Sequence, residues 1–415
     1  MSVRSESSSP SAESRSSEAG LVLLTLAVGL GLLTASWAAL HLPPFDYQIV
    51  DTPVYREYGE AMADGEVPYR DFELEYPPGA LPTFWLPTLG PAEHYDSIFE
   101  ALMWICAAAL LVLAVQGVAV LGGSPTRLLA VAVGIGLFPL ALGTVVLTRY
   151  DLWPAALTAA ALAAVLGGRG RLGLAVLGIA VAAKIYPLVL LPPLLVYVSR
   201  RKGRREAGIG FGVFAAAVAV VVVPFAVVAP EGLAESVDRQ LGRPLQIESL
   251  GASLLLAANQ LGLYEPAVVS SHGSQNVVGQ LPDVLATTQT ALQGAALVLL
   301  WFLFARGPAT PARLVAACAA SVVVVVALGK VLSPQFLIWL VPVVALAAGR
   351  TGLAVGALLG AALVTTHLWF PSRYWDLVDL QPVGWLALVR NVLLVSLAVV
   401  LGVITARERA PARSP

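Results

Sequence analysis

Runs of apolar residues long enough to cross a lipid bilayer dominate this sequence. The first, at residues 20–40, contains no charged side chain, and the hydrocarbon core of a bilayer takes about 20 helical residues. The whole chain of 415 residues is 58% hydrophobic and only 12% charged, with a mean hydropathy of +0.80. A soluble protein of this length could not cover its surface with so few charges. The sequence therefore predicts an all-α integral membrane protein.

Composition and motifs also argue against several classes of function. The net charge of −1 gives no electrostatic support for a nucleic-acid partner. The two cysteines, Cys106 and Cys318, lie in apolar runs and suggest neither a disulfide framework nor a metal site. The sequence contains no phosphate-binding loop, dinucleotide-binding glycine motif, zinc-protease motif or nucleophile elbow. We therefore expect no metal and no cofactor.

Basic residues set the expected topology, because they gather on the cytoplasmic side of membrane proteins. The strongest basic cluster, at residues 200–205, is placed inside. With the other basic turns on the same side, the chain forms a polytopic helical bundle with about twelve spans and both termini in the cytoplasm. The expected spans lie near residues 21–40, 97–122, 128–147, 152–168, 172–184, 186–198, 207–229, 286–305, 313–330, 336–349, 352–369 and 384–405.

This topology divides the chain into three parts and three outer loops. The first 19 residues are expected to be a disordered cytoplasmic tail, residues 20–406 a membrane domain, and residues 407–415 a second tail. The first apolar run is expected to be retained, because it is long for a signal peptide and no clear cleavage site follows it. The outer loops are residues 41–96, 230–285 and 371–382. We expect any chemistry on this side of a plasma membrane.

Two apolar stretches must enter the membrane and return to the cytoplasmic side if the basic turns before and after each stretch are both cytoplasmic. They are residues 172–198 and 314–349, and Lys184 and Lys330 lie near their centres. Each arm is short for a full span, so the turn is expected in a water-filled region at the outer face. An ionisable group at membrane depth is a functional candidate by default, with snorkelling to the headgroups as the alternative. The two lysines could bind a lipid-linked phosphate.

The first outer loop carries eleven acidic residues. A short helix is expected directly after Asp51, with proline two residues later. Asp51 is therefore interpreted either as a helix cap or as a general base acting on a hydroxyl. Most of the other acids are expected to be solvated. Glu75 and Tyr76 precede two prolines, which favour an extended lead-in to residues 77–90. That proline-rich stretch is expected to form an interfacial or re-entrant helix.

Two further polar strings leave alternatives open. Arg149 and Asp151 lie at the outer end of a helix pair, either as an interfacial anchor with a local ion pair or with Arg149 as a phosphate contact. Residues 243–249 contain Gln246 and Glu248 and either line an acceptor site or cap the helix that follows. The residues alone do not choose between these interpretations.

A family resemblance rests on seven short motifs in a specific order. They are VDTPVY (50–55), PYRDF (68–72), EYPPG (75–79), RYDLW (149–153), AKIYP (183–187), QIES (246–249) and KVLSPQ (330–335). Together they resemble the actinobacterial membrane glycosyltransferases of family 87, which are GT-C fold enzymes similar to polyprenyl-phosphomannose-dependent α-1,2-mannosyltransferases. The resemblance implies a polyprenyl-phosphate sugar donor and an acidic catalytic residue in the first outer loop. Asp51 matches it by position, although residues 71–75 offer rival carboxylates.

The resemblance and the residues together predict a glycosyltransferase. We expect it to move a hexose, with mannose favoured, to a hydroxyl of a glycolipid or glycan at the extracytoplasmic face, with inversion of a β-linked donor. Asp51 is the expected base, and Lys184, Lys330 and Arg149 are expected to bind the donor phosphate. The residues expected to contact substrate are Tyr55, Glu75, Tyr76, Asp151, Gln246, Glu248 and Gln335.

Two other classes of function remain open from the sequence. A transporter or lipid-linked sugar flippase would also have about twelve spans and charges at membrane depth, and inverted repeats with broken helices would support it. A non-catalytic scaffold of a cell-envelope complex would tolerate neutral substitutions in the acidic loop.

Overall fold

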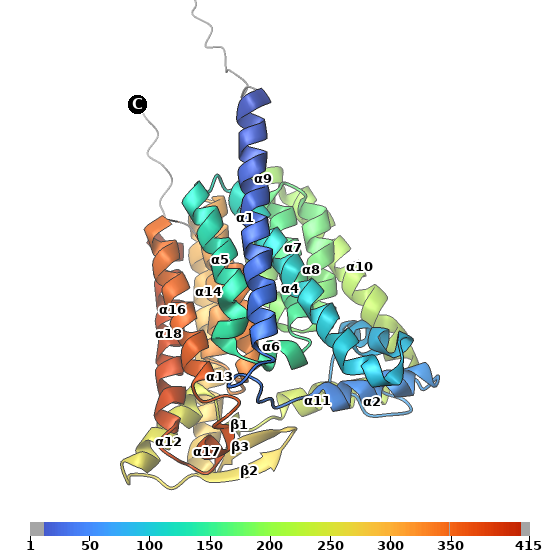
Figure 1. Ribbon diagram of the computed structural model, residues 1–415, viewed down its shortest axis with the longest axis vertical. Coiled ribbons are helices and arrows are strands. Elements are labelled where there is room, and N and C mark those ends of the chain that lie inside the picture. The colour runs from blue at the N-terminus through green and yellow to red at the C-terminus, as the bar shows by residue number, and fades with distance from the viewer. Residues whose placement is uncertain (1–11, 348, 408–415) are drawn as a thin grey trace, which may run out of the picture.

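The computed structural model describes residues 12–347 and 349–407, and it is mainly a bundle of roughly parallel helices (Figure 1). Within this part of the chain, six helices are long and apolar enough to cross a membrane. They are α1 (Ala12–Ala39), α4 (Tyr95–Val120), α5 (Pro125–Leu142), α10 (Arg204–Val228), α13 (Gln280–Arg306) and α18 (Gly384–Arg407). The prediction of a polytopic helical membrane protein is thereby supported.

Shorter apolar helices complete the bundle. They are α7 (Leu152–Leu166), α8 (Gly170–Ala183), α14 (Pro311–Ala327), α16 (Gly349–His367), and η5 (Pro334–Trp339) with α15 (Leu340–Ala345). The helix α9 (Leu191–Lys202) carries part of the basic cluster. The total of twelve spans remains a prediction, because several of these helices are too short to cross a bilayer on length alone.

The two predicted interruptions are present. Helix α8 ends at Ala183; Lys184, which follows, has an extended ψ of 139°, and the chain resumes in η4 (Tyr186–Leu190) before α9. Helix α14 ends at Ala327, and η5 begins only at Pro334. Proline disfavours a helical conformation in the residue before it, so Pro187 and Pro334 allow a new helix to start but not the old one to continue.

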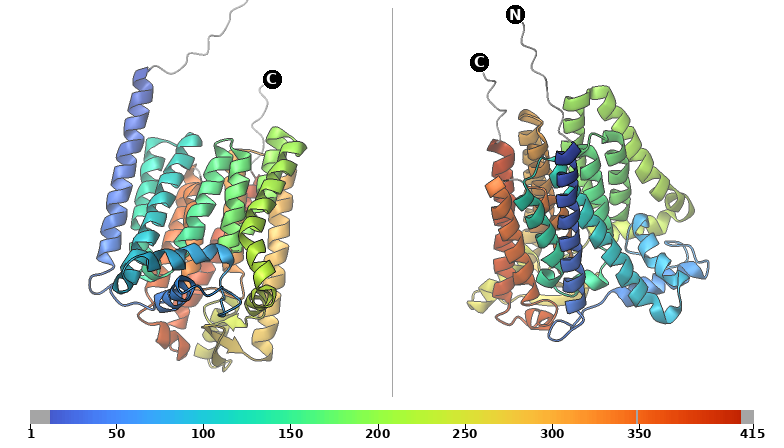
Figure 2. Two further views of the ribbon diagram at one scale, coloured as in Figure 1. Left: turned by 90° about the vertical axis from the view of Figure 1, so that its right-hand side faces the viewer. Right: turned by 45° about the horizontal axis from the view of Figure 1, so that its top comes forward.

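Short elements gather at one end of the bundle, which we call the loop end (Figures 1 and 2). The first described residues of α1 and the last of α18 lie at the opposite end. The loop end consists of α2 (Thr52–Ala63), η1 (Pro78–Ala80), α3 (Leu81–Trp85), η2 (Leu86–Leu89), η3 (Ala92–His94), α6 (Val145–Thr148), α11 (Pro230–Leu241), α12 (Leu250–Gln260), α17 (Tyr374–Val378) and a small sheet. The three predicted outer loops all belong to it.

The sheet was not predicted from the sequence. Strands β1 (Leu245–Gln246), β2 (Ala267–Ser271) and β3 (Ser274–Val278) are antiparallel in the order β1-β3-β2. Gly273 takes a left-handed φ of 65° in the tight turn between β2 and β3, which glycine permits without strain. The expectation of an all-α protein therefore holds only in part, because the protein is mostly rather than wholly helical.

Three other sequence expectations are refined here. Helix α1 begins at Ala12, inside the segment for which we predicted disorder; residues 1–11 and the tail residues 408–415 lie outside the described residues. The predicted extended lead-in is present, because Pro77 has a ψ of 155°. Residues 78–89 form η1, α3 and η2 in succession rather than one re-entrant helix, and a proline occupies the first turn of each.

Burial differs sharply between helices. Helix α14 is buried along almost its whole length and packs against α13 and α18. In the most apolar stretch of α10, only 6% of the residues are buried, and one side of this helix packs against α8. The exposed apolar side is expected to face lipid.

The position of the loop end across the membrane is open to a direct test. We expect a cysteine at exposed Glu66, in the first outer loop, to react with an impermeant maleimide in intact cells. A cysteine at exposed Arg201, in the basic cluster, should react only after permeabilisation, because basic loops stay in the cytoplasm. The unsubstituted protein is the control, since Cys106 and Cys318 are buried. Labelling of both positions from one side would contradict this topology.

Candidate functional site

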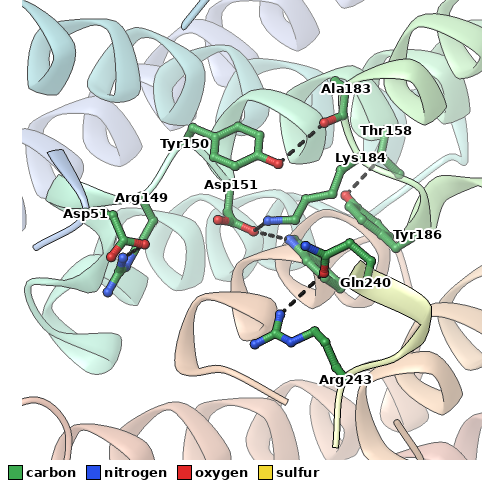
Figure 3. A network of polar contacts seen from close by, with 11 residues as sticks. Asp51, Arg149, Tyr150, Asp151, Thr158, Ala183, Lys184, Tyr186, Gln240 and Arg243 are labelled. Atoms are coloured by element: carbon green, nitrogen blue, oxygen red, sulfur yellow. Dashed lines mark hydrogen bonds and ion pairs between the residues drawn. The ribbon is translucent and has the colours of Figure 1, made fainter. Parts of the chain in front are cut away.

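A three-residue turn between α6 and α7 brings together polar groups from distant parts of the chain (Figure 3). Arg149, Tyr150 and Asp151 are respectively 5%, 0% and 1% exposed. Arg149 has extended backbone, which ends α6, while Asp151 occupies the N-cap position of α7 without making a capping hydrogen bond. Both charged side chains are therefore free to pair with other segments.

Arg149 forms an ion pair with Asp51, and its Nη2 donates to the Ile49 carbonyl at 3.3 Å. The Arg149 side chain is 6% exposed and that of Asp51 is 33% exposed. Asp51 occupies the N-cap position of α2, so the predicted helix start is confirmed, but its side chain makes no capping hydrogen bond. The capping interpretation of Asp51 was therefore wrong: the carboxylate faces the buried guanidinium instead.

Asp151 makes the second ion pair, with Lys184 at the break after α8. Lys184 Nζ lies 2.6 Å from Asp151 Oδ1, and Trp339 Nε1 donates to the same oxygen at 2.6 Å. The ammonium also lies 4.5 Å from the ring centre of Tyr150 and 5.1 Å from that of Trp339. The local ion pair that we considered within residues 149–151 is not the one formed, because each charge pairs with a remote residue.

The motif at residues 246–249 adjoins the second break. The backbone N–H of Gln246 donates to the Lys330 carbonyl at 3.0 Å, and Gln246 Nε2 donates to Ser333 Oγ at 2.9 Å and to Glu248. Lys330 Nζ donates to the Leu241 carbonyl at 2.9 Å. Ser249 caps α12 by accepting from the Ala252 N–H. The capping interpretation is therefore confirmed at Ser249. Gln246 and Glu248 are buried, and their role in an acceptor site stays a prediction.

Glu248 is a buried carboxyl surrounded by guanidinium groups. Glu248 is 2% exposed. Its backbone carbonyl accepts hydrogen bonds from Arg390 Nη2 at 2.6 Å and from Asn391 Nδ2 at 3.1 Å. Burial raises the pKa of the Glu248 carboxyl from 4.5 to about 7, against the opposing effect of the positive charges of Arg390, Arg243 and Arg149. Near neutral pH this group therefore exists in both its neutral and charged forms.

Arg243 interacts with charged groups of both the first and the second outer loop. Its Nη2 donates to Ser274 Oγ at 2.9 Å, and burial lowers the pKa of its guanidinium, which the Glu75 and Glu248 carboxylates oppose. Figure 3 shows its guanidinium next to Gln240, to whose Oε1 Arg243 Nη1 donates at 3.4 Å. We call the following residues the charged cluster: Asp51, Glu75, Arg149, Asp151, Lys184, Arg243, Glu248, Lys330 and Arg390.

Several guanidinium nitrogens of this cluster lack a protein partner. Among the described residues, the buried Nε atoms of Arg149, Arg243 and Arg390 have no hydrogen-bond acceptor, and neither does Arg390 Nη1. Buried donors without acceptors are rare in folded proteins, and they cost free energy. Oxygen atoms of an anion, such as a phosphate, are the natural partners for such groups.

Tyr55 and Tyr76, which we expected to contact substrate, pack their rings against Tyr150 in the turn at residues 149–151. Tyr55 is 1% exposed; its ring stacks on Phe84 at 4.5 Å and meets the ring of Tyr150 edge-on at 5.9 Å. The ring of Tyr76 lies 5.2 Å from that of Tyr150. Tyr55 therefore stabilises residues 149–151 from within the core. Gln335 is half-buried at the start of η5.

The rival carboxylates of the first outer loop lie in a different environment. Asp71 pairs with Arg70 at 2.8 Å, and hydrogen bonds from Arg70 lower the pKa of Asp71 to about 2. Glu73 pairs with Arg239 at 2.8 Å. Glu75 alone among these three belongs to the charged cluster. Sequence reasoning missed Arg390 and Asn391, although a charge inside an apolar span is itself a recognisable signal.

The pH dependence of stability follows from Glu248. Because its pKa is higher in the folded state, its stabilising contribution is complete below 4.5 and is lost as the pH rises through about 7. The melting temperature in detergent should therefore fall as the pH rises through about 7. We expect Glu248→Gln to remove the part of this fall that Glu248 causes, since glutamine stays neutral. Glu265→Gln, at an exposed position of the same loop, is the control and should follow the unsubstituted protein. An unchanged pH profile for Glu248→Gln would refute the assignment.

A comparison with models of protein families agrees with the resemblance noted from the sequence. The sequence model of glycosyltransferase family 87 matches residues 74–334. Among solved structures, the chain is similar to the crystal structure of ArnT from Cupriavidus metallidurans bound to undecaprenyl phosphate, with 15% identity and a TM-score of 0.48. That match covers 93% of this chain and 77% of the other. Among curated proteins, none matches the sequence. Since the family match covers more than half of the 415 residues, the chain belongs to glycosyltransferase family 87.

Proposed function

We propose that this membrane glycosyltransferase transfers a hexose, with mannose as the expected sugar, from a polyprenyl-phosphate donor. The acceptor is a hydroxyl of a cell-envelope glycolipid or glycan, and the site faces the extracytoplasmic side. The observation that carries the proposal is the charged cluster, in which a partly exposed carboxylate meets buried cations with unsatisfied donors. It lies in a chain of a glycosyltransferase family.

The cations are suited to hold the donor phosphate. When Glu248 is protonated, five positive side chains of the charged cluster face three negative ones and leave an excess of two positive charges. The positive groups are Arg149, Lys184, Arg243, Lys330 and Arg390, and the negative ones are Asp51, Asp151 and Glu75. A departing phosphate monoester also carries up to two negative charges, and preorganised positive groups stabilise charge that grows in the transition state.

Asp51 is the proposed general base. The acceptor oxygen forms a bond to the anomeric carbon, the bond from that carbon to the phosphate oxygen breaks, and the acceptor proton passes to Asp51. One displacement on a β-linked donor gives an α-linked product. Because Arg149 already holds Asp51, a phosphate that binds Arg149 would compete with this carboxylate and release it towards the acceptor.

The remaining predicted residues take supporting roles in this proposal. Gln246 and Gln335 are near enough to the break at residues 328–333 to contact the sugar or phosphate. Tyr55 and Tyr76 hold the turn at residues 149–151, and Asp151 orients Lys184. Both lysine breaks face the loop end, which favours one transfer site over the two alternating openings of a transporter.

Replacement of the proposed base is the sharpest test of enzyme activity. We expect Asp51→Asn to lower transfer of labelled sugar by about 10²–10⁴, because an amide cannot accept the proton. Insertion and expression should persist, because the asparagine amide oxygen can still accept a hydrogen bond from Arg149 and the Asp51 side chain makes no capping hydrogen bond to lose. Asp64→Asn, at the far end of α2, is the matched control. Near-normal transfer by Asp51→Asn, with loss in Glu75→Gln, would move the base to Glu75.

The two lysines should respond differently to replacement by methionine. Lys330→Met should weaken binding of polyprenyl phosphate in a titration with the purified protein, with little loss of stability, since Lys330 is only half-buried. Lys184→Met should also destabilise the fold, because it leaves Asp151 buried without its partner, which typically costs about 3–5 kcal/mol.

A compensated double variant separates these two effects. Lys184→Met with Asp151→Asn should regain stability while binding of polyprenyl phosphate stays weak. If the double variant regained both, Lys184 would be a structural residue. Unchanged affinity in Lys330→Met and in the double variant would exclude these lysines from the phosphate site.

A further inference from the structure

A separate cavity of about 530 Å³ lies at the loop end, between residues 69–74 of the first outer loop and residues 228–239. None of its lining residues belongs to the charged cluster. Ligand pockets in proteins usually enclose about 300–1,000 Å³. The cavity is therefore large enough for a small-molecule head group. The proposed reaction, as described above, assigns no substrate group to it.

The cavity has fixed walls. Tyr69 has a left-handed φ of 67°, which is unusual for a residue other than glycine, and its hydroxyl donates to the Tyr76 carbonyl at 2.5 Å. Gly232 of α11 lies directly against the Tyr69 carbonyl, since a Cβ there would lie 1.9 Å from that oxygen. The Phe72 ring stacks on Tyr58 at 5.8 Å. Tyr69 and Phe72 both line the cavity. Tyr69 is 5% exposed and its ring packs edge-on against Phe225, so half-buried Phe72 is the aromatic side chain open to a ligand.

The charge of the cavity is negative. Its acidic residues are Asp71, Glu73, Glu231 and Glu235, and its basic residues are Arg70 and Arg239. Both arginines are already paired: Arg70 with Asp71 at 2.8 Å, and Arg239 with Glu73 and Glu235 at 2.8 and 3.0 Å. An anionic ligand would be repelled. Ionised carboxylates accept hydrogen bonds but donate none, so they suit a neutral ligand with many hydroxyl donors.

The cavity also borders the lipid-facing helix. Val228, the last residue of α10, lines it, and the neighbouring Val227 is 73% exposed. An alkyl chain in the bilayer could lie along α10 while its polar head occupies the cavity. Helix α11 then leads to the charged cluster: Arg239 lines the cavity, Gln240 Nε2 donates to the Glu75 carbonyl at 3.4 Å, and Arg243 belongs to the cluster.

We propose that this cavity is the acceptor subsite, which binds the neutral, hydroxyl-rich head of a lipid-anchored sugar whose chain lies against α10. The Phe72 ring contacts the apolar face of the sugar ring, and the carboxylates accept hydrogen bonds from its hydroxyls. This inference rests on the proposed transfer reaction and names both the acceptor class and the side from which it approaches.

Binding at the cavity can be tested without any enzymatic activity. The probe is an octyl hexoside with a photoreactive diazirine in its alkyl chain, cross-linked to the full-length protein and mapped by mass spectrometry. We expect cross-links in peptides that contain residues 69–74 or 220–239. Octyl glucoside should compete, and octyl glucuronide, which differs by one carboxylate, should compete at least tenfold less well. Labelling confined to other regions, or equal competition by both compounds, would overturn the proposal.

Substitution of Glu231 tests whether the cavity binds the acceptor during transfer. Glu231 lines the cavity, lies on the exposed first turn of α11 and has no ion pair among the described residues. Loss of one charged hydrogen bond should raise the KM for an octyl hexoside acceptor about tenfold in Glu231→Gln, with the donor KM unchanged. The same variant should bind octyl glucuronide better than the unsubstituted protein. Asp238→Asn, on the same helix but outside the cavity lining, is the matched control.

The outcomes separate this inference from the proposed function. Absence of transfer to every acceptor by the unsubstituted protein would remove the proposed function, and the cross-linking result would still report on the cavity. Normal transfer with an identical acceptor KM in Glu231→Gln and Asp238→Asn would remove the acceptor subsite and leave the proposed function standing.

Discussion

Two ion pairs that start from neighbouring residues organise the loop end of this protein. Arg149 pairs with Asp51 from the first outer loop, and Asp151 pairs with Lys184 from the break after α8. An unpaired charge buried at the edge of a membrane costs several kcal/mol, so neither pair can open without a partner of another kind. The pairs therefore hold two distant segments at one turn, while Tyr150 between them packs into the aromatic core.

The same pairing shapes the chemistry that we propose. Ion pairs hold Arg149 and Lys184 in the resting site, yet donors such as the Arg149 Nε have no acceptor among the described residues. A phosphate would satisfy those donors and weaken the hold of Arg149 on Asp51. Protonation of Glu248 would give the site the positive excess that a phosphate needs. In this account, donor binding and release of the base are one event, because both act through the same guanidinium.

Features that depend on neighbouring residues could be predicted, and features that depend on remote ones could not. Pro187 and Pro334 mark the two helix breaks, and Asp51 with Pro53 marks the start of α2. The small sheet was missed because β1 has only two residues and pairs with β3, some 30 positions away. Similarly, Asp51 was weighed as a cap because its sequence context fits one, whereas Arg149, about 100 positions away, makes the contact that decides its role.

By itself, the sequence determined that this chain is a helical membrane protein of glycosyltransferase family 87 and which polar motifs could carry chemistry. Apolar length and motif order are properties of the chain that need no fold to be recognised. Only the tertiary structure decided which charges meet, that Arg243 and Arg390 join them, and that a negative cavity lies between the first outer loop and α11. The physical reason is that ion pairs and cavities arise between segments far apart in the chain, where burial rather than sequence spacing selects the partner.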